Sequence, residues 1–151
     1  MKYVNFTDFK SARGITFDPT KWLVVTQEMI DNFASATHDH QWIHIDQKRA
    51  EKESPYKKTI AHGFLSLGLI TTFLAESVQV ESLKMGFNYG IDSVRFPHPV
   101  VEGASLRGIV KLEAIEEQKF GALKIIWDIT VEIKDVKKPA CVAKMTTIAY
   151  E

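Results

Sequence analysis

The clearest pattern of apolar and polar positions lies in the last third of the chain. Over residues 122–134, apolar side chains at every second position alternate mainly with charged or polar ones. Such alternation predicts a strand with one packed face and one solvated face. Stretches at 105–113 and 141–150 are its expected neighbours, joined through turns at 116–121 and 135–139. Beyond about Phe87 we therefore expect an antiparallel meander.

A second pattern, at helical spacing, predicts an amphipathic helix over about 27–37, after an irregular N-terminus and a short strand near 21–25. Thr26 is a suitable N-cap because its hydroxyl can accept a hydrogen bond from a first-turn N–H. A helical turn over 47–53 follows, with Asp46 as its cap and Pro55 as its end. One face of the first helix gathers Ile30, Phe33, Ala34 and Thr37.

The segment 59–75 has no charged side chain apart from the charge that His62 can carry. Its apolar residues point in nearly every direction around a helix, so we expect this helix to be surrounded by protein. It is short for a bilayer span and is interrupted by glycines. A sheet with one apolar face that curls around such a helix predicts an α+β layer arrangement.

Composition narrows the class of protein. The 151 residues are 45% hydrophobic and 25% charged, which predicts one domain over 1–151 with its own core. Nineteen basic residues balance nineteen acidic ones, so we expect neither nucleic acid nor a membrane as a partner. The single cysteine, Cys141, and the lack of an apolar leader predict a reducing cytoplasm.

The densest group of candidate chemistry is a run of histidines after the first helix. His38, His40 and His44 fall within seven residues, with Asp39 between the first two. His-x-His spacing can chelate a metal, but no cysteine or orderly loop spacing completes a site, so we expect none. Asp39 and His44 could instead form an acid–base pair, because an imidazole exchanges protons near neutral pH. Plain polar surface groups are the third interpretation.

A second candidate lies at Gly63, near the predicted start of the apolar helix. The first N–H groups of a helix have no intrahelical partner and favour negative charge, and a glycine lets a ligand carbonyl approach. An enolate oxygen of a thioester is the kind of charge that such a donor stabilises. Gly63 could equally serve close helix packing alone.

These segments resemble a known family. The runs DHQWIHID at 39–46 and IAHGFL at 60–65 are similar to the motifs of the MaoC-like hydratases, above all to their NodN-like branch. The usual family pattern has Asn-Pro where this chain has Gln41-Trp42, and Gln-Trp is the variant of that branch. The likeness covers about residues 25–108, and the final strands match only in pattern.

The resemblance implies a hot-dog fold, usually dimeric, and (R)-specific hydration of trans-2-enoyl-CoA, or the reverse dehydration, without a metal or redox cofactor. Asp39 and His44 match the catalytic pair, and Gly63 matches the donor to the thioester oxygen. Gln41, Trp42, His62 and Phe64 are then the expected substrate contacts. The expected partners are an acyl-CoA thioester and a second copy of the chain.

Two other functions fit the same fold. One is a non-catalytic subunit that binds acyl-thioesters, against which the intact Asp39 and His44 argue. The other is a hot-dog thioesterase, which would release a free thiol. Neither the acyl chain length nor the carrier, coenzyme A or acyl carrier protein, follows from the sequence.

Overall fold

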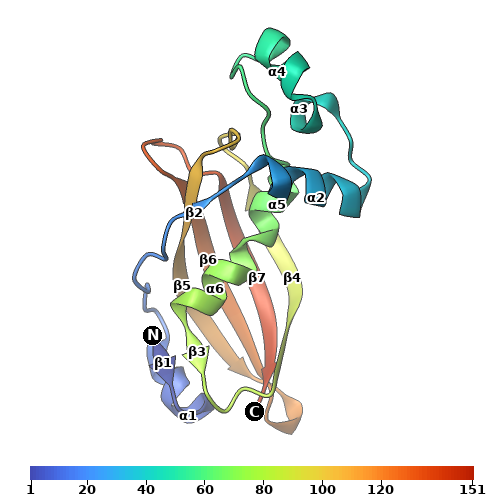
Figure 1. Cartoon of the computed structure of the whole chain (residues 1–151). Coiled ribbons are helices and arrows are strands. Elements are labelled where there is room, and N and C mark those ends of the chain that lie inside the picture. Colours follow the sequence, from blue (N-terminus) through green and yellow to red (C-terminus); the bar gives the residue numbers. More distant parts are fainter.

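A five-stranded antiparallel sheet forms the body of the molecule. The computed structural model describes residues 1–151 and places the strands in the order β2-β5-β6-β7-β4 (Figure 1). The strands are β2 (Leu23–Val24), β4 (Met85–Arg95), β5 (Ser105–Glu117), β6 (Leu123–Ile133) and β7 (Cys141–Tyr150). The sheet curls behind a helix that runs along its inner face. The predicted α+β architecture is confirmed.

The alternating segment is strand β6, and every second side chain of it is buried. It pairs with β5 on one side and β7 on the other, so the predicted meander is confirmed for these three strands. Strand β5 extends to Glu117, beyond the expected end at 113. The expectation that everything beyond Phe87 is strand is wrong for 96–104, where the chain crosses from β4 to β5 with two prolines on the way.

The inner helix differs from its prediction. It begins only at Gly63 and consists of α5 (Gly63–Gly68) and α6 (Ile70–Ser77), which meet at Leu69. Residues 59–62 are extended instead, because Ile60 forms a β-bridge with Val101 and the Ala61 N–H donates to the Val100 carbonyl.

The inner helix is also not surrounded on all sides. Its buried side chains form one stripe toward the sheet, made of Ser66, Ile70, Phe73 and Ser77. On the other side Phe64 is 66% exposed, and Thr71, Thr72 and Ala75 are also exposed. The expectation of a helix enclosed by protein is therefore wrong for a single chain, although this helix is the element that the sheet wraps.

Gly108 in β5 is the position where the inner helix comes closest to the sheet. A Cβ atom added to Gly108 would lie 2.4 Å from Cβ of Phe73. Phe73 is 1% exposed and belongs to the main hydrophobic core, as do Trp127 and Phe9. The missing side chain at Gly108 thus sets the distance between helix and sheet.

The N-terminus contains short elements that the sequence analysis did not predict. Strand β1 (Lys2–Tyr3) pairs in parallel with β3 (Gln79–Val80), and α1 (Phe6–Phe9) is followed by the 3-10 turn η1 (Lys10–Ala12). Another 3-10 turn, η2 (Lys119–Gly121), joins β5 to β6. No helix in the structure combines the length and apolar character that a membrane crossing would require.

Residues 38–60 form an arm that projects beyond one end of the sheet (Figure 1). It follows α2 (Gln27–Thr37), whose bounds and Thr26 cap are as predicted, with the Thr26 hydroxyl accepting from the Met29 N–H. The arm contains α3 (Trp42–Ile45), which was not predicted, and α4 (Gln47–Glu53), which has its predicted bounds and Asp46 cap. The arm carries Asp39 and His44 and returns to the body just before His62.

Candidate active site

Asp39 lies where the chain turns out of α2. His38 closes this helix in a left-handed conformation with φ of 60°, which is uncommon for a residue with a side chain and redirects the backbone. The Asp39 side chain is half-exposed. Its Oδ1 accepts from the Gln41 N–H at 3.4 Å, which ties the carboxylate to the start of α3.

His44 is held by both its backbone and its ring. The residue is 7% exposed, and its Nδ1 lies 2.6 Å from the Ile60 carbonyl oxygen. Since a carbonyl only accepts, Nδ1 carries the proton, and Nε2 of the neutral ring has a free lone pair. The Gln27 side-chain amide donates to the His44 carbonyl at 2.8 Å. This tautomer leaves His44 with one nitrogen that can take up a proton.

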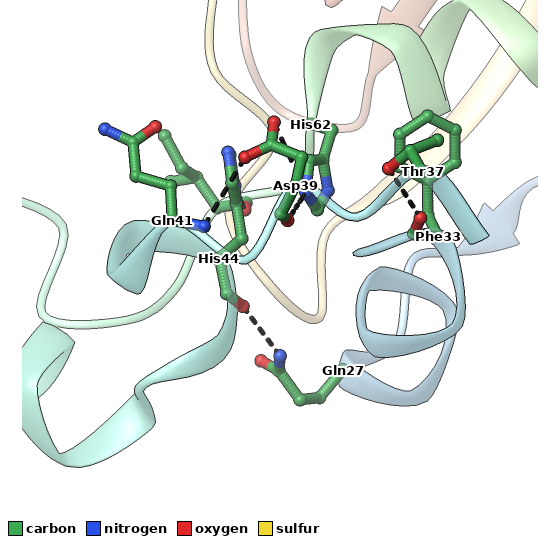
Figure 2. Close-up of polar contacts among 8 residues, drawn as sticks. Gln27, Phe33, Thr37, Asp39, Gln41, His44 and His62 are labelled. Atoms are coloured by element: carbon green, nitrogen blue, oxygen red, sulfur yellow. Dashed lines mark hydrogen bonds and ion pairs between the residues drawn. The ribbon is translucent and has the colours of Figure 1, made fainter. Parts of the chain in front are cut away.

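His62 lies directly against His44. The two rings stack with centroids 3.7 Å apart and planes inclined by 24°. His62 is 3% exposed, and its Nε2 donates to the Asp39 main-chain carbonyl at 3.0 Å. Figure 2 shows His62 between His44 and Phe33, with the Asp39 carboxylate facing the two imidazoles.

These contacts bring the predicted pair together. A carboxylate oxygen of Asp39 and a ring nitrogen of each histidine all lie within 4.8 Å of one another. One water molecule can bridge an acceptor pair at this separation, because each hydrogen bond to it spans about 2.8 Å. The other two histidines of the run, His38 and His40, are exposed and lie outside this group.

The pKa of His44 is lowered from its ordinary value of 6.5. Burial is the main cause, because a low-dielectric surrounding disfavours the imidazolium. The hydrogen bond to Ile60 and the charge of Asp39 act in the opposite direction, and His62 adds to the lowering. His44 is therefore neutral at pH 7 and can act as a base.

Gly63 is the first residue of α5. Its N–H donates no hydrogen bond within the chain, as expected for a helix start. A Cβ atom at this position would lie 3.1 Å from the Phe96 ring, so the absence of a side chain permits this close approach. Gly63 directly follows His62, so its amide nitrogen is bonded to the residue whose ring stacks on His44.

The other predicted contact residues are spread around this centre. Gln41 is exposed and precedes α3. Trp42 is half-buried, and the Arg49 guanidinium carbon lies 4.3 Å above its ring, so Trp42 packs within the arm. Phe64 is exposed and contacts Phe96 edge-on, with ring centroids 5.9 Å apart.

The Asp39, His44 and His62 group is poorly suited to a single metal ion. The lone pair of a histidine nitrogen lies in the plane of its ring. In the stacked rings of His44 and His62 the two planes are inclined by only 24°, so the lone pairs do not converge on one point. A zinc ion requires about 2.0–2.1 Å to each nitrogen, which two such lone pairs cannot satisfy together. Nδ1 of His44 and Nε2 of His62 are already hydrogen bonded to carbonyls.

A groove follows the exposed side of the inner helix. A cavity of 310 Å³ lies between α5 and β4, and a second of 430 Å³ continues along α6 toward Phe9 and Trp127. Thr71 and Asn88 line both cavities, so the two are neighbours along the inner helix. The first cavity begins at Phe64, beside Gly63, whereas Asp39 and His44 line neither.

Sequence reasoning missed this groove and the contact with Phe96. Both depend on residues of β4 and of the following loop, which lie far along the chain from the histidine run. The signal that the sequence offers is the apolar side chain at every second position of β4, at Phe87, Tyr89 and Ile91. The structure shows that all three are exposed.

The chain is similar to two bacterial proteins in sequence and to a solved structure in fold. The chain is 38% identical over 142 residues to the 3-hydroxyacyl-thioester dehydratase Z of Mycobacterium tuberculosis, which covers 94% of this chain and 93% of that protein. It is 39% identical over 150 residues to the nodulation protein N of Rhizobium meliloti, at 99% and 93% coverage. The R-hydratase PhaJ1 of Pseudomonas aeruginosa has the same fold, with a TM-score of 0.70 at 17% identity over 99% of this chain and 91% of the other.

The profile of the MaoC like domain matches residues 8–132, which include the whole arm, the inner helix and strands β4 and β5. The resemblance of the motifs at 39–46 and 60–65 to this family is thereby confirmed. The chain belongs to the MaoC-like family of hydratases and dehydratases.

Proposed function

We propose that this protein catalyses the reversible hydration of a trans-2-enoyl thioester to the (R)-3-hydroxyacyl thioester, with Asp39, His44 and Gly63 as its catalytic residues. One observation carries the proposal: a carboxylate oxygen of Asp39 and a ring nitrogen of His44 lie within 4.8 Å of each other. The unpaired N–H of Gly63 follows directly after His62, which belongs to the same group. The name of the mycobacterial relative, a 3-hydroxyacyl-thioester dehydratase, supports the same class of reaction.

In this mechanism Asp39 and His44 hold one water molecule. His44 Nε2 accepts a proton from it while the water oxygen forms a bond to C3, and the π electrons of the C2–C3 double bond move toward the thioester carbonyl. The Gly63 N–H donates to the carbonyl oxygen as it becomes an enolate. The Asp39–His44 pair then returns the proton taken from water to C2. The pair is thereby restored, the elements of one water are added, and no electrons are gained or lost.

The chemistry requires only acids, bases and hydrogen-bond donors. We therefore propose a reaction without metal or redox cofactor, and a coenzyme A thioester as the substrate. We also propose the cytoplasm as the compartment, because the sequence has a single cysteine.

A second copy of the chain is the partner that we propose. Strand β4 pairs only with β7, and its other edge is free. It exposes Met85, Phe87, Tyr89 and Ile91, and the open face of the inner helix exposes Phe64. An uncovered apolar edge strand of this length is an aggregation hazard. Two copies joined at β4 would cover this surface and would exclude water beside Gly63.

The test follows the enoyl-thioester absorbance with crotonyl-CoA and longer substrates. The native protein should hydrate at least one of them, and Asp39→Ala and His44→Ala should each lower the rate about a hundred- to ten-thousandfold. His40→Gln is the matched control, because His40 is exposed and lies outside the group. Chiral analysis of the product should give the (R) alcohol.

Three results would count against this proposal. Activity that survives both substitutions would remove the mechanism. A release of free thiol without loss of the double bond would make the protein a thioesterase. Binding of acyl-CoA with no turnover of any substrate would make it a non-catalytic subunit.

A further inference from the structure

His62 has a combination of contacts that filling space does not require. It is 3% exposed, yet its Nδ1 has no hydrogen-bond partner. A buried polar atom without a partner is destabilising, and a phenylalanine or leucine would fill the same space without that cost. The contacts that an apolar residue could not make therefore indicate that His62 has a role beyond filling space.

Two contacts of His62 reach the two proposed acid–base residues. Its ring face stacks on His44 at 3.7 Å, and its Nε2–H donates to the Asp39 carbonyl at 3.0 Å. Phe33 of α2 lies against the same ring, with centroids 4.9 Å apart. Phe33 and His62 both belong to the body of the protein. His62 therefore has a fixed position from which it contacts Asp39 and His44, the two ends of the arm segment 39–44.

We infer that His62 is a positioning residue: it fixes the His44 ring and the Asp39 backbone relative to each other and does not itself contact the substrate. This inference rests on the proposed function. Its burial behind His44 is the reason for assigning it a role other than the substrate contact expected from the motif. An imidazole offers both the flat ring and the N–H donor, whereas a phenyl ring has no donor and an aliphatic side chain has neither.

Two substitutions separate the two contacts. His62→Gln keeps a donor for the Asp39 carbonyl and removes the ring that stacks on His44. His62→Phe keeps a ring and removes the donor. His40→Gln again serves as the control for the loss of a histidine, since His40 has neither contact.

Each His62 variant should lower kcat by roughly ten- to a hundredfold, because small misplacements of reacting groups have effects of that size. KM should stay within about threefold of the native value, since the substrate does not touch His62. A rise in KM with unchanged kcat would overturn the inference, and so would a loss of rate that only follows the unfolded fraction.

A second measurement does not depend on turnover. Nitrogen-15 NMR of histidine-labelled protein should show the His44 Nδ1–H, which is hydrogen bonded to Ile60, as a slowly exchanging signal. In His62→Gln this signal should shift and exchange faster while the backbone amide spectrum stays native-like. An unaltered His44 signal in both variants would overturn the inference, even if the native protein had no hydratase activity.

Phe33→Leu provides a third variant if neither substitution of His62 yields folded protein. It leaves both nitrogen atoms of His62 in place and removes one ring that packs against it. We expect a smaller loss of kcat than for the His62 variants and a shifted His44 signal. Native kcat and a native signal in this variant would contradict the positioning role.

Discussion

At the scale of single residues, the tautomer of His44 decides what the group can do. Because Nδ1–H donates to Ile60, only Nε2 can take up a proton. The pairing of Asp39 with His44 could be predicted from their spacing in the sequence and from the family resemblance. The stacking of His62 on His44 could not, because it depends on how the arm returns to the body and not on any local pattern.

The lowered pKa of His44 predicts an acid limb in the pH profile. As the pH falls through this pKa, the imidazole takes up a proton and can no longer accept one from water. We expect kcat/KM to stay level near pH 7 and to decline below the ordinary histidine value of 6.5. A profile measured over about pH 5 to 8 checks this, and an inflection above 6.5 would contradict it.

The carboxylate of Asp39 gives this prediction an independent check. Its charge raises the pKa of His44 against the effect of burial. In Asp39→Asn the pKa of His44 should therefore fall further, which an NMR titration of the histidine ring measures without any need for activity. A rise of this pKa in the variant would show that another group controls His44.

Gly108 should be the most sensitive glycine for folding. In Gly108→Ala the new Cβ would overlap Phe73, which is closely packed and has no room to move, so we expect a loss of about 1–3 kcal/mol in the free energy of unfolding. Gly68→Ala is the control, because open space surrounds Gly68. Urea unfolding of both variants measures the difference, and equal stabilities would contradict the packing argument.

At the scale of elements, local signals predicted the outer helices well and the inner helix poorly. Caps and periodicity gave the bounds of α2 and α4, since a hydroxyl or carboxylate at the first turn acts within its own segment. The inner helix starts later than its apolar composition suggests, because residues 59–62 pair with the loop before β5. Long-range pairing of this kind leaves no periodic signal.

The cap of α2 can be tested directly. Thr26→Ala removes the acceptor for the Met29 N–H and should lower the free energy of unfolding by about 1 kcal/mol. Ser35→Ala lies on the exposed side of the same helix and should leave stability unchanged or slightly raise it. Thermal unfolding distinguishes the two, and equal midpoints for both variants would show that the cap contributes nothing.

At the scale of the whole molecule, one apolar surface is left uncovered in a single chain. The free edge of β4 and the open face of the inner helix present apolar side chains to solvent. The sequence predicted a helix enclosed by protein, and a second copy against this face would supply the missing cover. The family resemblance implied a second copy of the chain, but the surface that it would cover follows only from the exposure of β4 and Phe64 in the structure.

The proposed dimer has twice the 17.1 kDa mass of one chain, and sedimentation experiments should show a particle of that size. Tyr89→Lys places a charge on the exposed edge strand and should shift the protein toward the monomer. Val142→Lys places the same charge on β7, which is paired on both sides, and should leave the dimer intact. A native protein that sediments as a monomer and still hydrates enoyl-thioesters would contradict the proposed dimer.

The arm of residues 38–60 and the body of the molecule carry different parts of the candidate site. The arm carries Asp39 and His44, whereas Gly63 and the groove belong to the body. Exchange of this segment alone would separate Asp39 and His44 from Gln27 and His62, the residues that hold them. A new arm therefore has to match the body at these two residues.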